Sequence, residues 1–252
     1  NLNSTDWNRI GWYWSEGYKG IKYANTAITY IDLPTWKTEE EKNAVLGAAY
    51  FHRAYRYYML TNEFGDVPSV MKEVTTPRVY FYSVKREVIL QKMKEDLEFA
   101  EQWVPVKAAG GEVTKGAVSH LLTKVNLALG KFDDAIASAT RVIDDGVHAL
   151  MTARFGVDAG NATKNVIWDL HRPLNKAAAA NTEALMLVID RDGYMNVGDF
   201  DGGGSTMRQA VPFWFSNINT PTGNKGTTDA LKKNQSRVDF DQATDYGRGI
   251  GR

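Results

Sequence analysis

The sequence predicts a mainly α-helical protein in which paired helices support an irregular, loop-rich region with a few short strands. Three observations lead to this prediction. Apolar residues recur at helical spacing over most of residues 18–146. The stretch 120–146 has the pattern of a complete helical hairpin. Residues 147–252 hold most of the glycines and show little helical periodicity. We therefore expect a helical scaffold over 1–146 and a loop-rich region over 147–252, packed together as one structural domain.

Residues 120–146 predict two helices joined by a tight turn. Apolar residues recur at helical spacing on both sides of the turn, at Leu121, Leu122, Val125 and Leu129, then at Phe132, Ala135, Ile136, Ala139, Val142 and Ile143. A Leu-Gly pair before an aromatic residue, with small residues at fixed offsets, is typical of a tetratricopeptide hairpin. One hairpin cannot bury its apolar faces alone, so neighbouring helices must cover it. We expect Leu129 and Ile136 to lie in the resulting core.

Three longer helices are predicted before the hairpin, over 18–31, 38–63 and 84–103. Asn25 lies on the apolar face of the first helix, where we expect its amide to bond to backbone or to a neighbouring helix. Thr38 and Glu41 form a capping box at the start of the second, and Thr114 caps the first helix of the hairpin. The second helix is apolar on most faces, which is typical of a helix between neighbours. An apolar stripe marks the third helix, at Val88, Met93, Leu97 and Ala100.

The C-terminal part of the chain gives weaker signals. Residues 165–170 and 184–189 have the composition of short strands or buried extended segments. The small-residue run 176–184 is the one stretch there with helical character. Residues 191–206 and 216–236 are rich in Gly, Asn, Thr and Asp and predict loops.

The composition and motifs exclude several classes of function. The formal net charge is +0, which gives no indication of a nucleic-acid partner, and the chain contains no cysteine. No apolar run reaches the length of a membrane span. The Asp199-x-Asp201 loop is not an EF-hand, because the twelfth position is Ala210 rather than an acid. Phosphate-binding and zinc-protease motifs are absent from the sequence. We therefore expect no cofactor, no metal and no catalytic residue.

A series of motifs, taken in order, resembles one known family. They are Arg53-Ala54 with Tyr57, running into Phe64-Gly-Asp-Val-Pro68, then Asp96-Leu97 with Ala100, and then Val113-Thr-Lys-Gly-Ala117 before the hairpin. Each motif alone is weak, but their order and spacing resemble the SusD/RagB family of surface glycan-binding lipoproteins of Bacteroidetes-type bacteria. The resemblance covers residues 7–170 well and the remainder loosely. Against that family, the chain looks truncated at both ends.

The resemblance implies a fold and a function. The fold is a right-handed α/α superhelix of tetratricopeptide-like helix pairs that scaffolds loops. The function is non-enzymatic binding of oligosaccharides, or of peptides in some members, at the extracellular face of the outer membrane. Such proteins deliver their ligand to a SusC-like TonB-dependent transporter and contact the membrane through an N-terminal lipid anchor, which we expect to lie outside the given residues. No family ligand residue is transferred by position, because these residues vary among members.

Exposed aromatic rings with polar neighbours are what a sugar site needs. A sugar stacks its apolar C–H face on Trp or Tyr rings and bonds through its hydroxyls to polar side chains. Loops on a rigid scaffold are the natural place for them. Three stretches qualify, and they supply the candidate ligand-binding residues Trp7, Asn8, Trp12, Tyr80, Tyr82, Asp199, Arg208 and Trp214.

Two alternatives remain open from the sequence. The first is a tetratricopeptide scaffold for protein–protein contact that holds no small ligand. The second is an enzyme, for which Asp190 and Asp192 would be the carboxylate pair, although closeness in sequence does not establish the required geometry.

Overall fold

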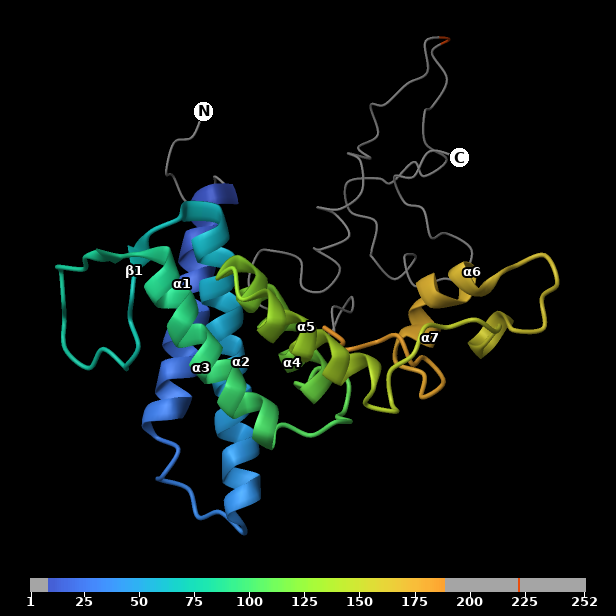
Figure 1. Cartoon of the computed structure of the whole chain (residues 1–252), viewed down its shortest axis with the longest axis horizontal. Coiled ribbons are helices and arrows are strands. Elements are labelled where there is room, and N and C mark those ends of the chain that lie inside the picture. The colour runs from blue at the N-terminus through green and yellow to red at the C-terminus, as the bar shows by residue number, and fades with distance from the viewer. Residues whose placement is uncertain (1–8, 189–221, 223–252) are drawn as a thin grey trace. The chain divides into compact units, whose positions relative to one another are not determined.

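The computed structural model describes residues 9–188 and Thr222, and these are mainly helical, as predicted (Figure 1). The long helices are α1 (Arg9–Thr29), α2 (Glu39–Phe64), α3 (Arg86–Trp103), α4 (Lys115–Ala128) and α5 (Phe132–Ile143). The shorter elements are the strands β1 (Val67–Pro68) and β2 (Ser83–Val84), the 3-10 turn η1 (Gly156–Asp158), and the helices α6 (Val166–His171) and α7 (Pro173–Lys176).

Helices α1, α2 and α3 lie side by side, and α2 makes the contacts that join the other two (Figure 1). The core between them holds, among others, Ile21, Tyr57, Leu60, Met93 and Leu97. Each such side chain stabilises the fold by about 1.5–3 kcal/mol relative to exposure. α2 is not buried on all sides, because Val45 and Tyr55 remain 44% and 42% exposed.

The predicted boundaries of the second and third helices are close to those observed, whereas the first helix begins at Arg9 rather than at residue 18. α1 begins at Arg9, so Trp12 lies in its first turns rather than in a loop. The Thr38 hydroxyl accepts the Glu41 amide at 3.1 Å, which confirms the predicted cap of α2. Val88 is 60% exposed, and its predicted place in the apolar stripe is wrong. The face of α3 that packs inward passes through Ile89 instead, one residue further round the helix.

Helices α4 and α5 form the predicted hairpin. Thr114 caps α4 through its hydroxyl, and Gly130 turns the chain with a φ of 70°. α4 packs on α3 and buries Val118, Leu122 and Val125. Hence the hairpin buries its inner helix against the three-helix core and leaves the outer helix at the surface.

The outer helix α5 meets α4 with small side chains, and its bulky apolar residues point outward. Ala135 and Ser138 are buried, whereas Phe132, Ile136 and Ile143 are 64%, 65% and 73% exposed. The prediction that Ile136 lies in the core is therefore wrong, while Leu129 is partly buried against the core. Small residues let two helix backbones approach closely, so the face that carries them becomes the contact.

Gly116 allows a later segment to pack on the start of α4. A Cβ at this position would lie 2.7 Å from Cε1 of His148 and 3.2 Å from Cδ2 of Leu185. The Thr114 hydroxyl donates to the Leu185 carbonyl as well. The Val-Thr-Lys-Gly-Ala motif thus has a structural role, because the segments that contain His148 and Leu185 both pack against the start of α4 at this motif.

Within the described residues, neither of the two C-terminal stretches forms a strand. Residues 166–171 form α6, because the Asn165 side chain accepts the Trp168 amide at 3.0 Å and caps a helix. Residues 184–188 adopt no regular structure, and helix α7 ends at Lys176, where the predicted helical run would begin. The strand pair observed is β1 with β2, antiparallel, with Val67 opposite Val84. The predicted loops 191–206 and 216–236 lie outside the described residues, apart from Thr222.

Arg154 organises the segment 152–176 with polar contacts rather than an apolar core. Its Nε donates to Asp169 Oδ2 at 2.5 Å, and its Nη1 donates to the carbonyls of Asn161 and Lys164, each at 2.6 Å. A hydrogen bond from Arg154 also holds the pKa of Asp169 below its usual range. One guanidinium therefore ties together a segment with little regular structure.

The hairpin geometry predicts unequal costs for two truncations. Leu122→Ala should lower the free energy of unfolding by about 2–5 kcal/mol, because it opens a cavity at a site that is 1% exposed. Ile136→Ala should lower it by less than about 1 kcal/mol, because that side chain is mostly in water. Urea denaturation of both variants measures the difference. Equal losses would show that α5 buries its bulky face after all.

Candidate functional site

The structure describes three of the candidate ligand-binding residues. Tyr80 and Tyr82 lie on the loop 69–82 between β1 and β2, which extends away from the helices (the teal loop in Figure 1), and Trp12 lies near the start of α1. The other candidates, Trp7, Asn8, Asp199, Arg208 and Trp214, lie outside the described residues.

The loop between β1 and β2 presents a run of exposed aromatic side chains. Tyr80 and Tyr82 are 72% and 80% exposed, and Phe81 between them is 44% exposed. The guanidinium carbon of Arg78 lies 5.5 Å from the centroid of the Phe81 ring, which is a cation–π distance. A cluster of exposed rings on a loop is unusual enough to indicate a contact surface.

A buried polar network lies beneath the base of this loop. Arg53 of α2 donates to Asp96 of α3 with two parallel hydrogen bonds from one edge of its guanidinium, Nε to Oδ2 at 2.7 Å and Nη2 to Oδ1 at 2.9 Å. The Nη1 group of Arg53 donates to Asn25 Oδ1 of α1 at 3.0 Å and to the Met71 carbonyl at 2.9 Å. One side chain therefore connects three helices to the loop.

Side chains of α1 and α2 hold the backbone of the loop base. Asn25 Nδ2 donates to the Val70 carbonyl at 2.8 Å and to the Lys72 carbonyl at 3.3 Å. The Tyr18 hydroxyl donates to the Pro68 carbonyl at 2.8 Å. The backbone carbonyls of the loop base thus bond to side chains of helix α1, whereas those of a surface loop normally bond to water.

Tyr57 both donates to and accepts from the same loop residue. Its hydroxyl donates to the Val70 carbonyl at 3.1 Å and accepts the Val70 amide at 2.5 Å. Burial raises the pKa of Tyr57 to about 12, so the phenol keeps its proton and can donate at neutral pH. Burial also raises the pKa of Tyr18.

An ion pair closes the neck of the loop beside the strand pair. Lys85 Nζ lies 2.8 Å from Asp66 Oδ2, and the Arg86 amide donates to Asp66 Oδ1 at 3.0 Å. The hydrogen bond from Lys85, with that from Arg86, holds the pKa of Asp66 below its usual range. Because the side chains of this pair are exposed, the pair adds little to the stability of the fold, and its main effect is on the position of the backbone at the neck of the loop.

Trp12 lies on a separate element from the two tyrosines. It is 49% exposed and packs edge-on against Tyr13, with the ring centroids 6.0 Å apart. Its neighbour Trp14 packs instead against Tyr18 and Phe64, with centroids 5.0 Å apart in each case. Of the two tryptophans, Trp12 is the one with a ring face available to a ligand.

Sequence reasoning found the rings of the loop and predicted that Asn25 has a partner, but it did not find the network around Arg53. The expected backbone bonds of Asn25 are confirmed, because a buried amide on an apolar helix face must find partners. Arg53 was visible as a polar exception on an apolar helix, but its partner Asp96 lies 43 residues away. A buried cation predicts that a carboxylate lies beside it, but the sequence does not identify which carboxylate that is.

Within the described part of the chain, no group of three His, Cys, Asp or Glu side chains is placed to hold a metal ion. No helix there is long and apolar enough to cross a membrane.

His148 contacts Asp145, its Nδ1 lying 2.6 Å from Oδ2. Burial raises the pKa of Asp145, but hydrogen bonds from the His148 ring and from two backbone amides outweigh it and lower the pKa. This pair holds the turn that follows α5.

Comparison with known proteins identifies similar chains. The model of a SusD-like family, described as starch-binding and associating with the outer membrane, matches residues 1–127, half of the chain. SusD-like protein P2 of Formosa agariphila is 29% identical over 136 residues, which are 53% of this chain and 27% of that protein.

Solved structures share the fold. A SusD-like protein of Bacteroides fragilis has a TM-score of 0.61 and 21% identity, over 73% of this chain and 34% of that one. A laminarin-binding SusD-like protein has a TM-score of 0.50 and 25% identity, over 58% of this chain and 32% of that one. The chain thus spans roughly a quarter to a third of the length of these relatives.

The buried ion pair predicts strong non-additivity. Arg53→Met should lower the free energy of unfolding by about 3–5 kcal/mol, because it leaves the Asp96 carboxylate buried without its partner. The double variant Arg53→Met/Asp96→Leu should be more stable than Arg53→Met alone, because neither charge then remains buried. Urea denaturation of the parent, of Arg53→Met, of Asp96→Leu and of the double variant gives the coupling energy. Additive losses would mean that the two side chains act independently.

The role of Asn25 predicts a local effect on the loop. Asn25→Ala removes the donor to the Val70 and Lys72 carbonyls and should speed amide hydrogen exchange over residues 69–82. Lys22→Ala, at an exposed site on the same helix, is the control and should leave exchange in the loop unchanged. If Asn25→Ala leaves the loop as protected as in the parent, the amide does not hold the loop base.

Proposed function

This chain belongs to the SusD-like family, and we propose that it is a non-enzymatic protein that binds oligosaccharides on the loop between β1 and β2. One observation carries the proposal: Tyr80 and Tyr82 are exposed on a loop whose base is tied to the helices by buried hydrogen bonds. A loop that is held at its base before binding loses less entropy when its tyrosines stack on a ligand.

The chemistry of the loop suits a pyranose ring. The C–H face of a sugar stacks on a tyrosine ring, and the phenol hydroxyl adds a donor and an acceptor at the ring edge. Neither interaction needs a charged catalytic group. Trp12 stays a proposed ligand-binding residue on its own element, and Trp7, Asn8, Asp199, Arg208 and Trp214 stay proposed ligand-binding residues outside the described part of the chain.

The relatives support the ligand class. A solved SusD-like relative that is 25% identical is laminarin-binding, and the family model that matches this chain is described as starch-binding. Neutral glucans are therefore the first ligands to test.

The proposal includes delivery and location. The protein would pass its oligosaccharide to a SusC-like TonB-dependent transporter at the extracellular face of the outer membrane, where an N-terminal lipid anchor would hold it. The description of the family as associating with the outer membrane supports the location. Copurification of a TonB-dependent transporter with the protein from its native membrane would test the partner.

One observation favours the alternative, a scaffold for protein contact. The face of α5 that carries Phe132, Ile136 and Ile143 is exposed and apolar. A scaffold without a small ligand would leave the fluorescence of its aromatic residues unchanged when sugar is added, whereas the oligosaccharide proposal requires a change.

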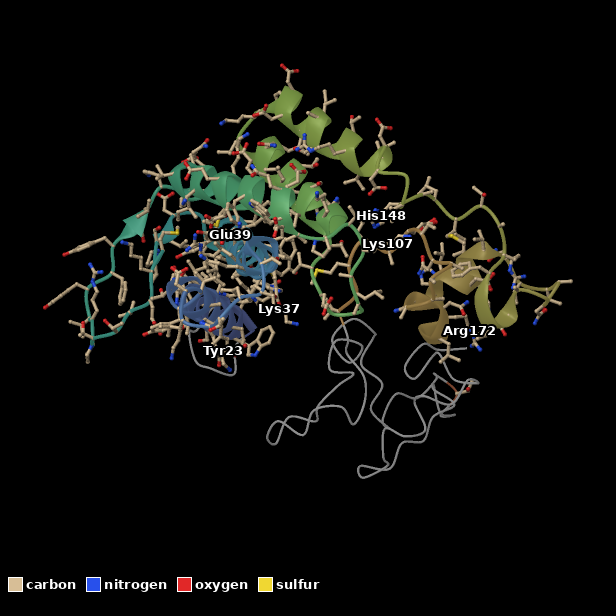
Figure 2. The ribbon with its side chains drawn as sticks, turned by 90° about the horizontal axis from the view of Figure 1, so that it is seen from below. Tyr23, Lys37, Glu39, Lys107, His148 and Arg172 are labelled. Atoms are coloured by element: carbon tan, nitrogen blue, oxygen red, sulfur yellow. The ribbon has the colours of Figure 1, made fainter. Side chains whose placement is uncertain are left out.

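Removing either tyrosine should weaken binding. We expect Tyr80→Ala and Tyr82→Ala each to raise the Kd for a laminarin oligosaccharide by about fivefold to tenfold, the equivalent of about one stacking contact. Tyr23→Ala is the matched control, because Tyr23 lies on α1 and is 62% exposed (Figure 2). Calorimetry measures the Kd, and a glycan array widens the ligand set. A folded parent that binds no oligosaccharide on the array would end the proposal.

A further inference from the structure

The aromatic loop carries positive charge that its own acids do not balance. Lys72 and Arg78 are both exposed, and residues 74–82 contain no Asp or Glu. The one nearby acid within the loop, Glu73, faces α1, where its Oε1 accepts the Thr26 hydroxyl at 3.0 Å. A hydrogen bond with Glu73 also raises the pKa of Tyr30, which begins the turn after α1. The outer surface of the loop therefore presents two cations and no carboxylate.

Arg78 differs from the arginines that serve the fold. Four of those pair with carboxylates within the described residues, namely Arg53, Arg141, Arg154 and Arg172. No carboxylate within the described residues forms an ion pair with Arg78, and its guanidinium lies over the Phe81 ring instead. A guanidinium stacked on a ring keeps its N–H edge free, and that edge matches a carboxylate or a sulfate with two parallel hydrogen bonds.

Lys72 supplies a second cation in the same loop, six residues before Arg78. Its backbone carbonyl accepts a hydrogen bond from Asn25 at 3.3 Å, so the residue sits on the rigid base of the loop. Both cations precede Tyr80 and Tyr82 in the same loop, and Arg78 is only two residues from Tyr80. A neutral glucan could use the rings but would gain nothing from either cation.

We propose that the loop recognises an acidic oligosaccharide, with sugar rings stacked on Tyr80 and Tyr82 and a carboxylate or sulfate group bound by Arg78 with support from Lys72. The proposal rests on oligosaccharide binding at this loop and adds the ligand class. Because the whole chain has a formal net charge of +0, the preference for anions arises locally from the loop.

Calorimetry with three probes tests the ligand class. A neutral laminarin oligosaccharide, an alginate oligosaccharide and a sulfated carrageenan oligosaccharide are titrated into the 252-residue chain at low salt and at about 0.5 M NaCl. At low salt we expect at least one acidic probe to bind about tenfold more tightly than laminarin, and added salt to reduce that advantage. The alginate and carrageenan arms separate a carboxylate from a sulfate as the bound group.

Substitution identifies the cation. Arg78→Gln should weaken binding of the preferred acidic probe by about tenfold, the loss expected for a charge-assisted hydrogen bond, and should leave laminarin binding nearly unchanged. Arg78→Lys keeps the charge but lacks the fork, and should restore only part of the affinity. Lys107→Gln makes the same change in charge in the exposed connection between α3 and α4 (Figure 2) and should have no effect.

The outcomes are distinct. If laminarin binds at least as tightly as both acidic probes, or if Arg78→Gln and Lys107→Gln behave alike, the ligand class is wrong while oligosaccharide binding stands. If no probe binds to the folded parent and the glycan array is also blank, oligosaccharide binding itself fails, and this proposal fails with it.

Discussion

The ion pair between Arg53 and Asp96 is the contact on which the rest of the scaffold depends. Taking both charges out of water is costly, and the cost is offset only because the guanidinium finds a partner for each of its edges. Those partners come from α1, α3 and the loop base. The hydrogen bonds that offset the cost of burying the two charges therefore also fix the positions of the three helices and the loop base relative to one another.

The molecule separates support from contact. In the hairpin, α4 packs against α3, and the buried polar network bonds to the backbone of the loop base. The exposed rings of Tyr80 and Tyr82 take part in neither the hairpin packing nor the polar network. A loop with a fixed base and an exposed tip can present tyrosines and a stacked arginine without ordering them anew for each ligand. Substitutions at the exposed tip should therefore leave the fold intact.

The sequence predicts well what depends on neighbouring residues. Helical spacing of apolar residues located the long helices, and the caps at Thr38 and Thr114 were recognisable because capping uses residues three positions apart. Asn25 on an apolar face required a backbone or helix partner. The rings of the loop were visible as Tyr80 and Tyr82. Residues 165–170 misled, because a short apolar run fits a strand or a helix, and the Asn165 cap favoured the helix.

By itself, then, the sequence determined the helices, their caps, the hairpin and the aromatic character of the loop, because each depends on local spacing. Only the tertiary structure decided that Arg53 pairs with Asp96, that Ile136 faces water, and that Glu73 turns inward and leaves Arg78 on the loop surface. These outcomes depend on which residues that are distant in sequence become neighbours in the folded protein. Packing geometry in three dimensions settles that, and a linear pattern does not record it.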